Sequence, residues 1–182
     1  SMNKALALFI VMICIAFAVT AQITGKVFPN MTAETVEDKK IDLPQSVAGK
    51  YTLLGLAYSK KSEDELNSWF QPIFERFIQK SKGSVFDGFT YDVNVYFVPM
   101  FTGINAAATG TAKKKAIKNV DPNLLPYILF YKGELKAYKE ALDFEKKDIP
   151  YFFVLDKEGK IIYATSGKFS KAKMDEIEEV FE

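Results

Sequence analysis

The chain has 182 residues, of which 24 are basic and 23 acidic, with one cysteine and no histidine. This composition lacks the groups for disulfide exchange, for Cys–His or Ser–His nucleophilic catalysis and for zinc sites built on Cys and His. A net charge close to zero gives no electrostatic field that attracts nucleic acid or an anionic membrane surface. We therefore expect no nucleic-acid partner, no metal and no small-molecule cofactor.

The first 21 residues are typical of a secretory signal peptide. Lys4 precedes an apolar stretch over residues 5–19, and Val19 and Ala21 occupy positions −3 and −1 of a cleavage site before Gln22. The apolar stretch is shorter than the ~20 residues that span a bilayer, which favours cleavage over the alternative of a retained anchor. Cleavage removes Cys14, so we expect a cysteine-free single domain over residues 22–182 in a secreted or periplasmic compartment.

The chain after the leader opens with a predicted β-hairpin. Residues 25–31 and 35–43 are typical of two short strands, with a turn near residues 37–40. Residues 51–58 then form a continuous apolar run without a helical stripe, as in a strand that is buried on both faces of a sheet. We expect the central strand of the domain there.

A long helix is predicted directly after this strand. The spacing of Ser62 and Glu65 matches a capping box, so the helix is expected to begin near Ser62. Pro72 lies inside the helix and should kink it. One broad apolar stripe is predicted to cover the sheet, and it consists of Leu66, Trp69, Phe70, Ile73, Phe74 and Phe77.

The middle of the chain predicts a second strand, a basic helix and a third, shorter strand. Residues 92–101 predict a strand parallel to the first, because a helical crossover joins the two. Residues 104–120 predict either a packed helix or a mobile basic arm. The lysine run there is more typical of a solvated face than of a binding patch. Residues 127–131 predict a short strand, which a short helix over residues 135–142 follows.

The last third of the chain has the clearest pattern. Residues 149–156 predict a strand, Gly159 lies in a turn, and residues 161–166 predict the antiparallel return strand. Ser170 is placed to cap a final helix with one apolar face.

The buried strand, short turn and proline-containing helix, followed by Ile149-Pro150-Tyr151 and a strand–turn–strand–helix ending, resemble the thioredoxin-like superfamily. The resemblance implies an α/β fold with three α/β/α layers, a central mixed sheet and an N-terminal β-hairpin. It also implies a cis Ile149–Pro150 bond. Redox members carry Cys-x-x-Cys in the turn before the helix. This chain instead has Ser59-Lys60-Lys61-Ser62-Glu63-Asp64, which contains no sulfur.

A closer resemblance is to the thioredoxin-like family of the mitochondrial ATP synthase assembly factor. The similar segments are residues 59–69, the basic segment into residues 119–122, and residues 151–161. The resemblance implies a redox-inactive protein that binds a membrane subunit during assembly. The leader departs from the family, because it is of the export type and not an Arg-rich transit peptide.

In thioredoxin-like proteins the start of the first helix and the proline loop form a shallow face that binds extended peptide. We therefore predict a binding site for a protein or peptide client, with membrane-associated proteins among the candidates, and no catalytic residue. The residues of this predicted site are Tyr58, Lys60, Lys61, Asp64, Ile149, Pro150 and Tyr151.

Two alternatives remain open at this point. The same residues can be ordinary turn and capping residues, or Lys60 or Lys61 can act with Asp64 or a tyrosine as an acid–base pair. The enzyme alternative is weaker, because a lysine beside carboxylates on an exposed helix start stays protonated and makes a poor base.

Overall fold

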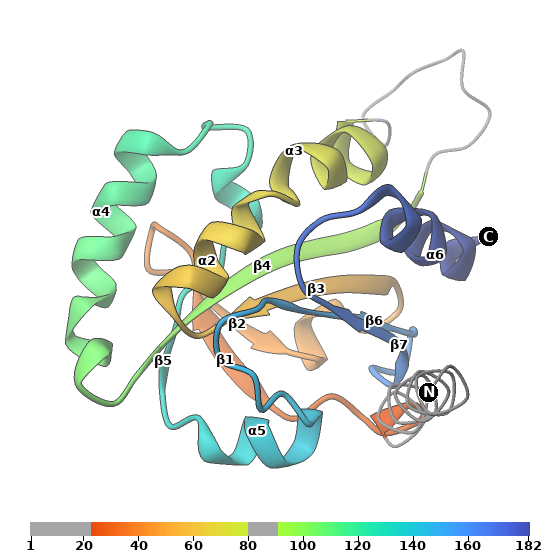
Figure 1. The fold of residues 1–182 in the computed structure, drawn as a ribbon, viewed down its shortest axis with the longest axis horizontal. Coiled ribbons are helices and arrows are strands. Elements are labelled where there is room, and N and C mark those ends of the chain that lie inside the picture. The colour runs from red at the N-terminus through yellow and green to blue at the C-terminus, as the bar shows by residue number, and fades with distance from the viewer. Residues whose placement is uncertain (1–22, 80–90) are drawn as a thin grey trace, which may run out of the picture.

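The computed structural model describes residues 23–79 and 91–182. The predicted signal peptide and its cleavage site lie outside the described residues. A central mixed sheet has the strand order β5-β4-β3-β6-β7 (Figure 1). Its strands are β3 (Tyr51–Ala57), β4 (Val93–Thr102), β5 (Tyr131–Gly133), β6 (Tyr151–Leu155) and β7 (Ile161–Ser166). The β3, β4 and β5 strands run parallel, whereas β6 and β7 pair antiparallel.

Helices cover one face of this sheet, and a hairpin and a short helix cover the other. The first layer contains α2 (Lys60–Asn67), α3 (Phe70–Ile73), the π-helical turn η2 (Phe74–Gln79) and α6 (Lys171–Phe181). The second layer contains the antiparallel hairpin of β1 (Met31–Glu34) and β2 (Lys40–Leu43), together with α5 (Lys136–Leu142). This arrangement confirms the predicted α/β/α layers, the mixed sheet and the N-terminal hairpin (Figure 1). The first strand of the hairpin is Met31–Glu34, however, and not residues 25–31 as predicted.

Two apolar cores form because β3 presents side chains to both faces. Leu54 and Leu56 point into the core under the hairpin and α5, whereas Leu53 and Ala57 point into the core under α2, α3 and α6. Six of the seven β3 residues are buried. The continuous apolar run therefore did predict a strand that is covered on both sides.

The first helix begins three residues earlier than predicted. Its N-cap is Ser59, whose hydroxyl accepts the Ser62 N–H at 3.1 Å, while the Ser62 hydroxyl accepts the Ser59 N–H at 2.9 Å. The sequence alone did not show this because serine can occupy either side of a capping box. The correction moves Lys60 and Lys61 from the preceding turn into the first turn of α2.

Pro72 interrupts the helix as predicted. The break between α2 and α3 lies at Ser68 and Trp69, about one turn before the proline. A proline has no N–H for the carbonyl four residues earlier, and its ring crowds that carbonyl, which belongs to Ser68. Most of the predicted stripe is buried, but Phe70 and Phe74 remain half-exposed at its margin.

The basic segment is helical but differs from the prediction at one lysine. It contains the 3₁₀ turn η4 (Gly103–Ala108) and α4 (Thr109–Asn119), and the only fully buried residues of α4 are Thr109 and Lys113. Lys113 was predicted to be solvated together with its neighbours. It is buried because two carboxylates of the hairpin pair with its ammonium group.

The remaining elements follow the predicted order. The third strand, β5, begins at Tyr131, later than predicted, because η5 (Leu125–Tyr127) occupies the start of the expected range. The Ser170 hydroxyl accepts the Lys173 N–H at 3.2 Å and caps α6 as predicted. Among the described residues, no helix is both long and apolar enough to cross a bilayer.

Candidate functional site

The two parts of the predicted site meet at one end of the central sheet. Leu56 pairs with Tyr151 in the antiparallel register of β3 and β6. Tyr58 therefore follows β3 at the same end of the sheet at which residues 149–151 enter β6. We call this end of the sheet the Tyr58 edge. The structure thus brings the strand end, the start of α2 and the proline loop together, as the sequence predicted.

Three aromatic rings pack against one another at this end of the sheet, and we call them the aromatic cluster. The Phe144 ring lies between Tyr58, at a centroid distance of 5.3 Å, and Tyr151, at 5.4 Å. Phe144 itself is fully buried, while the two tyrosines are partly exposed. Phe144 lies in the loop after α5 and belongs to no strand or helix. For this reason the sequence did not predict its place in the site.

Hydrogen bonds fix the loop of residues 143–148 against the strand end. The Tyr58 hydroxyl lies 2.8 Å from the Phe144 carbonyl, to which it donates, and 3.1 Å from the Glu145 carbonyl. The Tyr151 hydroxyl oxygen accepts the Lys146 N–H at 2.9 Å. Both tyrosines therefore hold the loop by contacts to its backbone.

Ser59 links the same loop to the start of α2. Its hydroxyl donates to the Lys147 carbonyl at 2.7 Å and also lies 3.3 Å from a carboxylate oxygen of Asp148. Ser59 was not among the predicted site residues, because its role depends on a partner 88 residues away in the chain.

Both tyrosines at this edge remain neutral phenols at physiological pH. Burial, followed by the neighbouring Tyr151, raises the pKa of Tyr58 to about 12. Burial likewise raises the pKa of Tyr151. A phenol with a raised pKa is a poor general base, so the geometry favours hydrogen-bonding roles for these two residues.

The charged residues of the predicted site lie on the first turns of α2 and face solvent. The Lys60 ammonium lies 3.6 Å from a carboxylate oxygen of Asp64. The two side chains are 87% and 63% exposed. Lys61 is exposed beside them. Such an exposed pair contributes little to stability and leaves both groups available to a partner.

The proline loop differs from the prediction in two respects. The Ile149–Pro150 bond is trans, and the cis peptide bond among the described residues is Leu43–Pro44 instead. Pro150 is also buried, and its carbonyl accepts the Gly167 N–H at 2.8 Å. Trans is the preferred state of an X-Pro bond. Ile149 is half-buried.

A cavity of about 350 Å³ adjoins the aromatic cluster on its α5 side. The Lys139 ammonium lies 5.4 Å from the centroid of the Tyr58 ring, within the range of a cation–π contact. The cavity is lined by Leu135, Lys136, Lys139, Glu140 and Glu145. Sequence reasoning gave no signal for it, because α5 was predicted only as a short covering helix.

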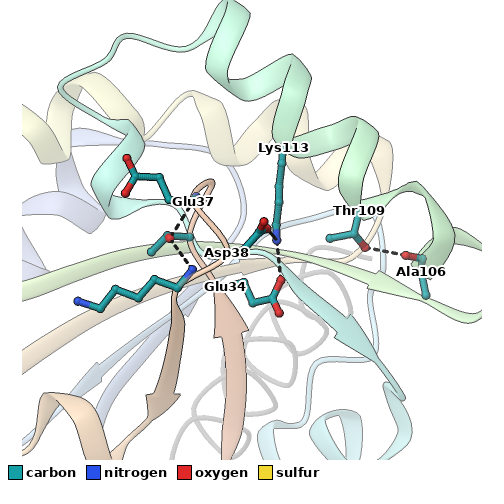
Figure 2. A network of polar contacts seen from close by, with 8 residues as sticks. Glu34, Glu37, Asp38, Ala106, Thr109 and Lys113 are labelled. Atoms are coloured by element: carbon teal, nitrogen blue, oxygen red, sulfur yellow. Dashed lines mark hydrogen bonds and ion pairs between the residues drawn. The ribbon is translucent and has the colours of Figure 1, made fainter.

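A second polar cluster lies away from this edge, between α4 and the hairpin (Figure 2). The Lys113 ammonium lies 2.5 Å from a carboxylate oxygen of Glu34 and 2.7 Å from one of Asp38. Asp38 has a left-handed backbone, with φ of 63°, in the turn that joins β1 to β2. Lys113 lowers the pKa of Asp38 through its hydrogen bond and its charge, and the two carboxylates raise the pKa of Lys113 despite its burial. Among the described residues, no group of three His, Cys, Asp or Glu side chains could hold a metal ion.

The comparison with known protein families gives a match that includes every residue described by the structure. The family described as ATP10 protein matches residues 22–182. A comparison with curated proteins finds no match.

Several solved structures share the fold at low sequence identity. The thioredoxin domain of a thiol-disulfide oxidoreductase from Bacteroides vulgatus is 18% identical, with a TM-score of 0.56 over 87% of this chain and 98% of that chain. A putative thiol:disulfide interchange protein DsbE from Chlorobium tepidum is 15% identical, with a TM-score of 0.54 over 86% and 93%. BsSco, a member of the Sco family of cytochrome c oxidase assembly proteins, is 11% identical, with a TM-score of 0.56 over 86% and 92%. These similarities confirm a thioredoxin-like fold.

Proposed function

The chain belongs to the ATP10 protein family, and from this premise we propose that it is a non-enzymatic assembly factor that binds a protein client. The client site is the edge formed by the start of α2 and the loop of residues 143–151. We also propose that this activity lies outside the cytoplasm, which the export-type pattern of residues 1–21 supports. A membrane-associated client fits the resemblance to the ATP synthase assembly factors.

The observation that carries this proposal is the construction of the edge around Tyr58. Redox relatives of this fold place thiols at the start of the first helix, whereas this chain places Ser59 and two lysines there. The Tyr58 and Ser59 hydroxyls are both used to fix the neighbouring loop. The edge is therefore rigid, and it offers a surface but no reactive sulfur.

The surface that remains open to a client combines aromatic and charged groups. Tyr58 and Tyr151 are partly exposed. Lys61 and the Lys60–Asp64 ion pair are exposed on the adjacent helix turn. Partly exposed tyrosines contribute large, rigid contact area at low entropic cost, and flanking charges add specificity. Pro150 is buried and supports this surface without lying on it.

A photo-crosslinking experiment tests the proposal. A photoreactive amino acid replaces Lys61 in one variant and Lys26 in a control variant, and each is irradiated in the native cell envelope. Lys26 is also exposed, but it lies far from the proposed client site. Its carbonyl accepts the Ile161 N–H at the end of β7 opposite to that site. We expect a discrete protein adduct from position 61 alone. Equal labelling, or no labelling at position 61, would contradict the assignment of the client site.

A charge-reversal variant provides a second test of the same surface. Lys60→Glu combined with Lys61→Glu should reduce client capture severalfold in a pull-down. The thermal midpoint should change little, because exposed charges contribute only ~0–1 kcal/mol each. Unchanged capture would exclude these lysines from the interface.

A further inference from the structure

The outer side of α4 carries three lysines that the hairpin does not use. Lys114, Lys115 and Lys118 are exposed, whereas Thr109 and Lys113 lie on the inner side of the same helix. We call the three exposed side chains the lysine face. No acidic residue occurs between Gly103 and Asn119. Within the described part of the chain, none of the three lysines forms an ion pair.

The outer side of α6 carries the opposite charge. Asp175, Glu176 and Glu179 lie away from the buried Met174 and Ile177, and we call these three carboxylates the acidic face. They are only weakly engaged within the chain. Lys171 pairs with Asp175 at 2.7 Å one turn earlier, and the Tyr163 hydroxyl donates to Glu176 at 2.5 Å. Each of these contacts leaves a carboxylate oxygen free for another donor.

The two faces match in length and spacing. Both helices contain 11 residues, and in both faces the charged residues stand at the first, second and fifth positions of a five-residue segment. When the helices lie antiparallel, Lys114 and Lys118, one turn apart, oppose Glu179 and Asp175, also one turn apart. Asp175 then exchanges Lys171 of its own helix for a lysine of the other. The net charge of +1 for the whole chain offers little repulsion between copies.

The two faces lie too far apart to meet within one molecule. The η4 turn that leads into α4 contacts β5, and α6 contacts β7, and these strands are the two edges of the sheet. Figure 1 shows α4 and α6 at opposite sides of the molecule. We propose that copies of this chain associate head to tail, with the lysine face of one copy against the acidic face of the next.

This geometry determines the form of the assembly. Because the two faces differ, the contact is heterologous, and repeated contacts give a ring or an open chain of copies. Exposed ion pairs are individually weak and screened by salt, so the association depends on concentration and ionic strength. It leaves the edge around Tyr58 uncovered, since that edge belongs to neither helix.

Sedimentation velocity of the purified protein tests the proposal. We expect the mean mass to rise with protein concentration at low salt and to fall back to that of one chain near ~1 M salt, where the Debye length is about 3 Å. Lys114→Glu, Lys115→Glu and Lys118→Glu together should abolish this rise. The control variant reverses Lys26, Lys157 and Lys160 to Glu, which are exposed and lie outside the proposed client site, and it changes the net charge equally. It should retain the rise.

A mixing experiment separates this contact from general charge effects. A second variant carries Asp175→Lys, Glu176→Lys and Glu179→Lys, and it should also remain a single chain. Mixing it with the lysine-face variant should restore the larger species, because each variant then meets faces of the opposite charge, whereas neither variant should form them alone. Circular dichroism checks that each variant is folded. A wild-type protein that stays a single chain at all concentrations, or an association that survives the lysine-face reversal, would overturn the proposal.

Discussion

The ammonium group of Lys113 lies 2.5 Å from the carboxylate of Glu34, 79 residues earlier in the chain. This contact and the one to Asp38 are the principal attachment of α4, because the helix buries no large apolar side chain. An apolar stripe normally holds a surface helix on its core. Here a charged cluster holds it, and the placement of α4 therefore depends on this one lysine.

Lys113→Met should loosen α4 and lower the free energy of unfolding by ~1–3 kcal/mol, since it leaves charged partners of a nearly buried group unpaired. Hydrogen exchange should increase across Thr109–Asn119 more than in the sheet. Lys114→Met is the matched control, because Lys114 is exposed on the same helix, and it should change stability by no more than ~0.5 kcal/mol. Unchanged exchange in α4 would show that other contacts hold the helix.

The same cluster predicts a loss of α4 docking in acid. Lys113 lowers the pKa of Asp38 below its unfolded value, so this contribution to stability is present above that value and is lost as the pH falls through the lowered pKa. Hydrogen exchange of α4 should therefore increase at acidic pH before the sheet unfolds. The Asp38→Asn variant should lack most of this pH dependence.

Tyr58→Phe should destabilise the loop of residues 143–148, because it removes the donor to the Phe144 carbonyl. The substitution preserves the packing of the ring against Phe144. We expect a loss of ~0.5–1.5 kcal/mol in urea unfolding. Tyr96→Phe is the control, since no hydrogen bond of that hydroxyl occurs among the described residues, and it should be nearly neutral. Equal effects of the two substitutions would mean that the Tyr58 hydroxyl does not stabilise the loop.

Alkaline pH should lower the free energy of unfolding, because several tyrosines have raised pKa values in the folded protein. Burial raises the pKa of Tyr58 to about 12, and it also raises those of Tyr138 and Tyr163 above the ordinary value. The folded state then keeps protons that the unfolded state releases, so stability is complete below about pH 10 and declines as the pH rises above it. Urea midpoints on either side of that pH measure the decline. Tyr58→Phe should reduce it, whereas a pH-independent midpoint would contradict the raised pKa values.

Gly55→Ala should be destabilising although the residue lies in a strand. An added Cβ would lie 2.6 Å from Cε1 of Phe152 and 3.0 Å from Cδ1 of Leu66, which is too close for either contact. We expect a loss of ~1–3 kcal/mol from overpacking. Gly110→Ala on α4 is the control, because a Cβ there meets no atom within 4 Å, and it should stabilise the helix by ~0.5–1 kcal/mol. A neutral Gly55→Ala would mean that Phe152 and Leu66 can move apart.

The aromatic stripe of the first helix should divide into core and margin. Phe77→Ala should cost ~3–5 kcal/mol because this ring is fully buried. Phe74 was expected in the same core, but it is half-exposed, so Phe74→Ala should cost clearly less. Thermal unfolding of the two variants compares them directly, and equal losses would place Phe74 in the core after all.

Most elements could be predicted, in their order and type, from the amino-acid sequence. Hydrophobic periodicity is a local property, so the run at residues 51–58, the stripe from Leu66 to Phe77 and the final hairpin could each be predicted without knowledge of their partners. The break before Pro72 and the cap at Ser170 follow from the backbone chemistry of single residues. The meeting of Tyr58 with residues 149–151 followed from recognising the fold.

The side chains that cap, pair or become buried at each site could be identified only in the folded structure. Ser59 and Ser62 are equivalent caps in the sequence, and the partner of Ser59 at Lys147 decides between them. Lys113 is indistinguishable from Lys114 until the hairpin brings Glu34 beside it. Burial and pairing of a polar group depend on residues far away in the chain, and no local pattern encodes that distance.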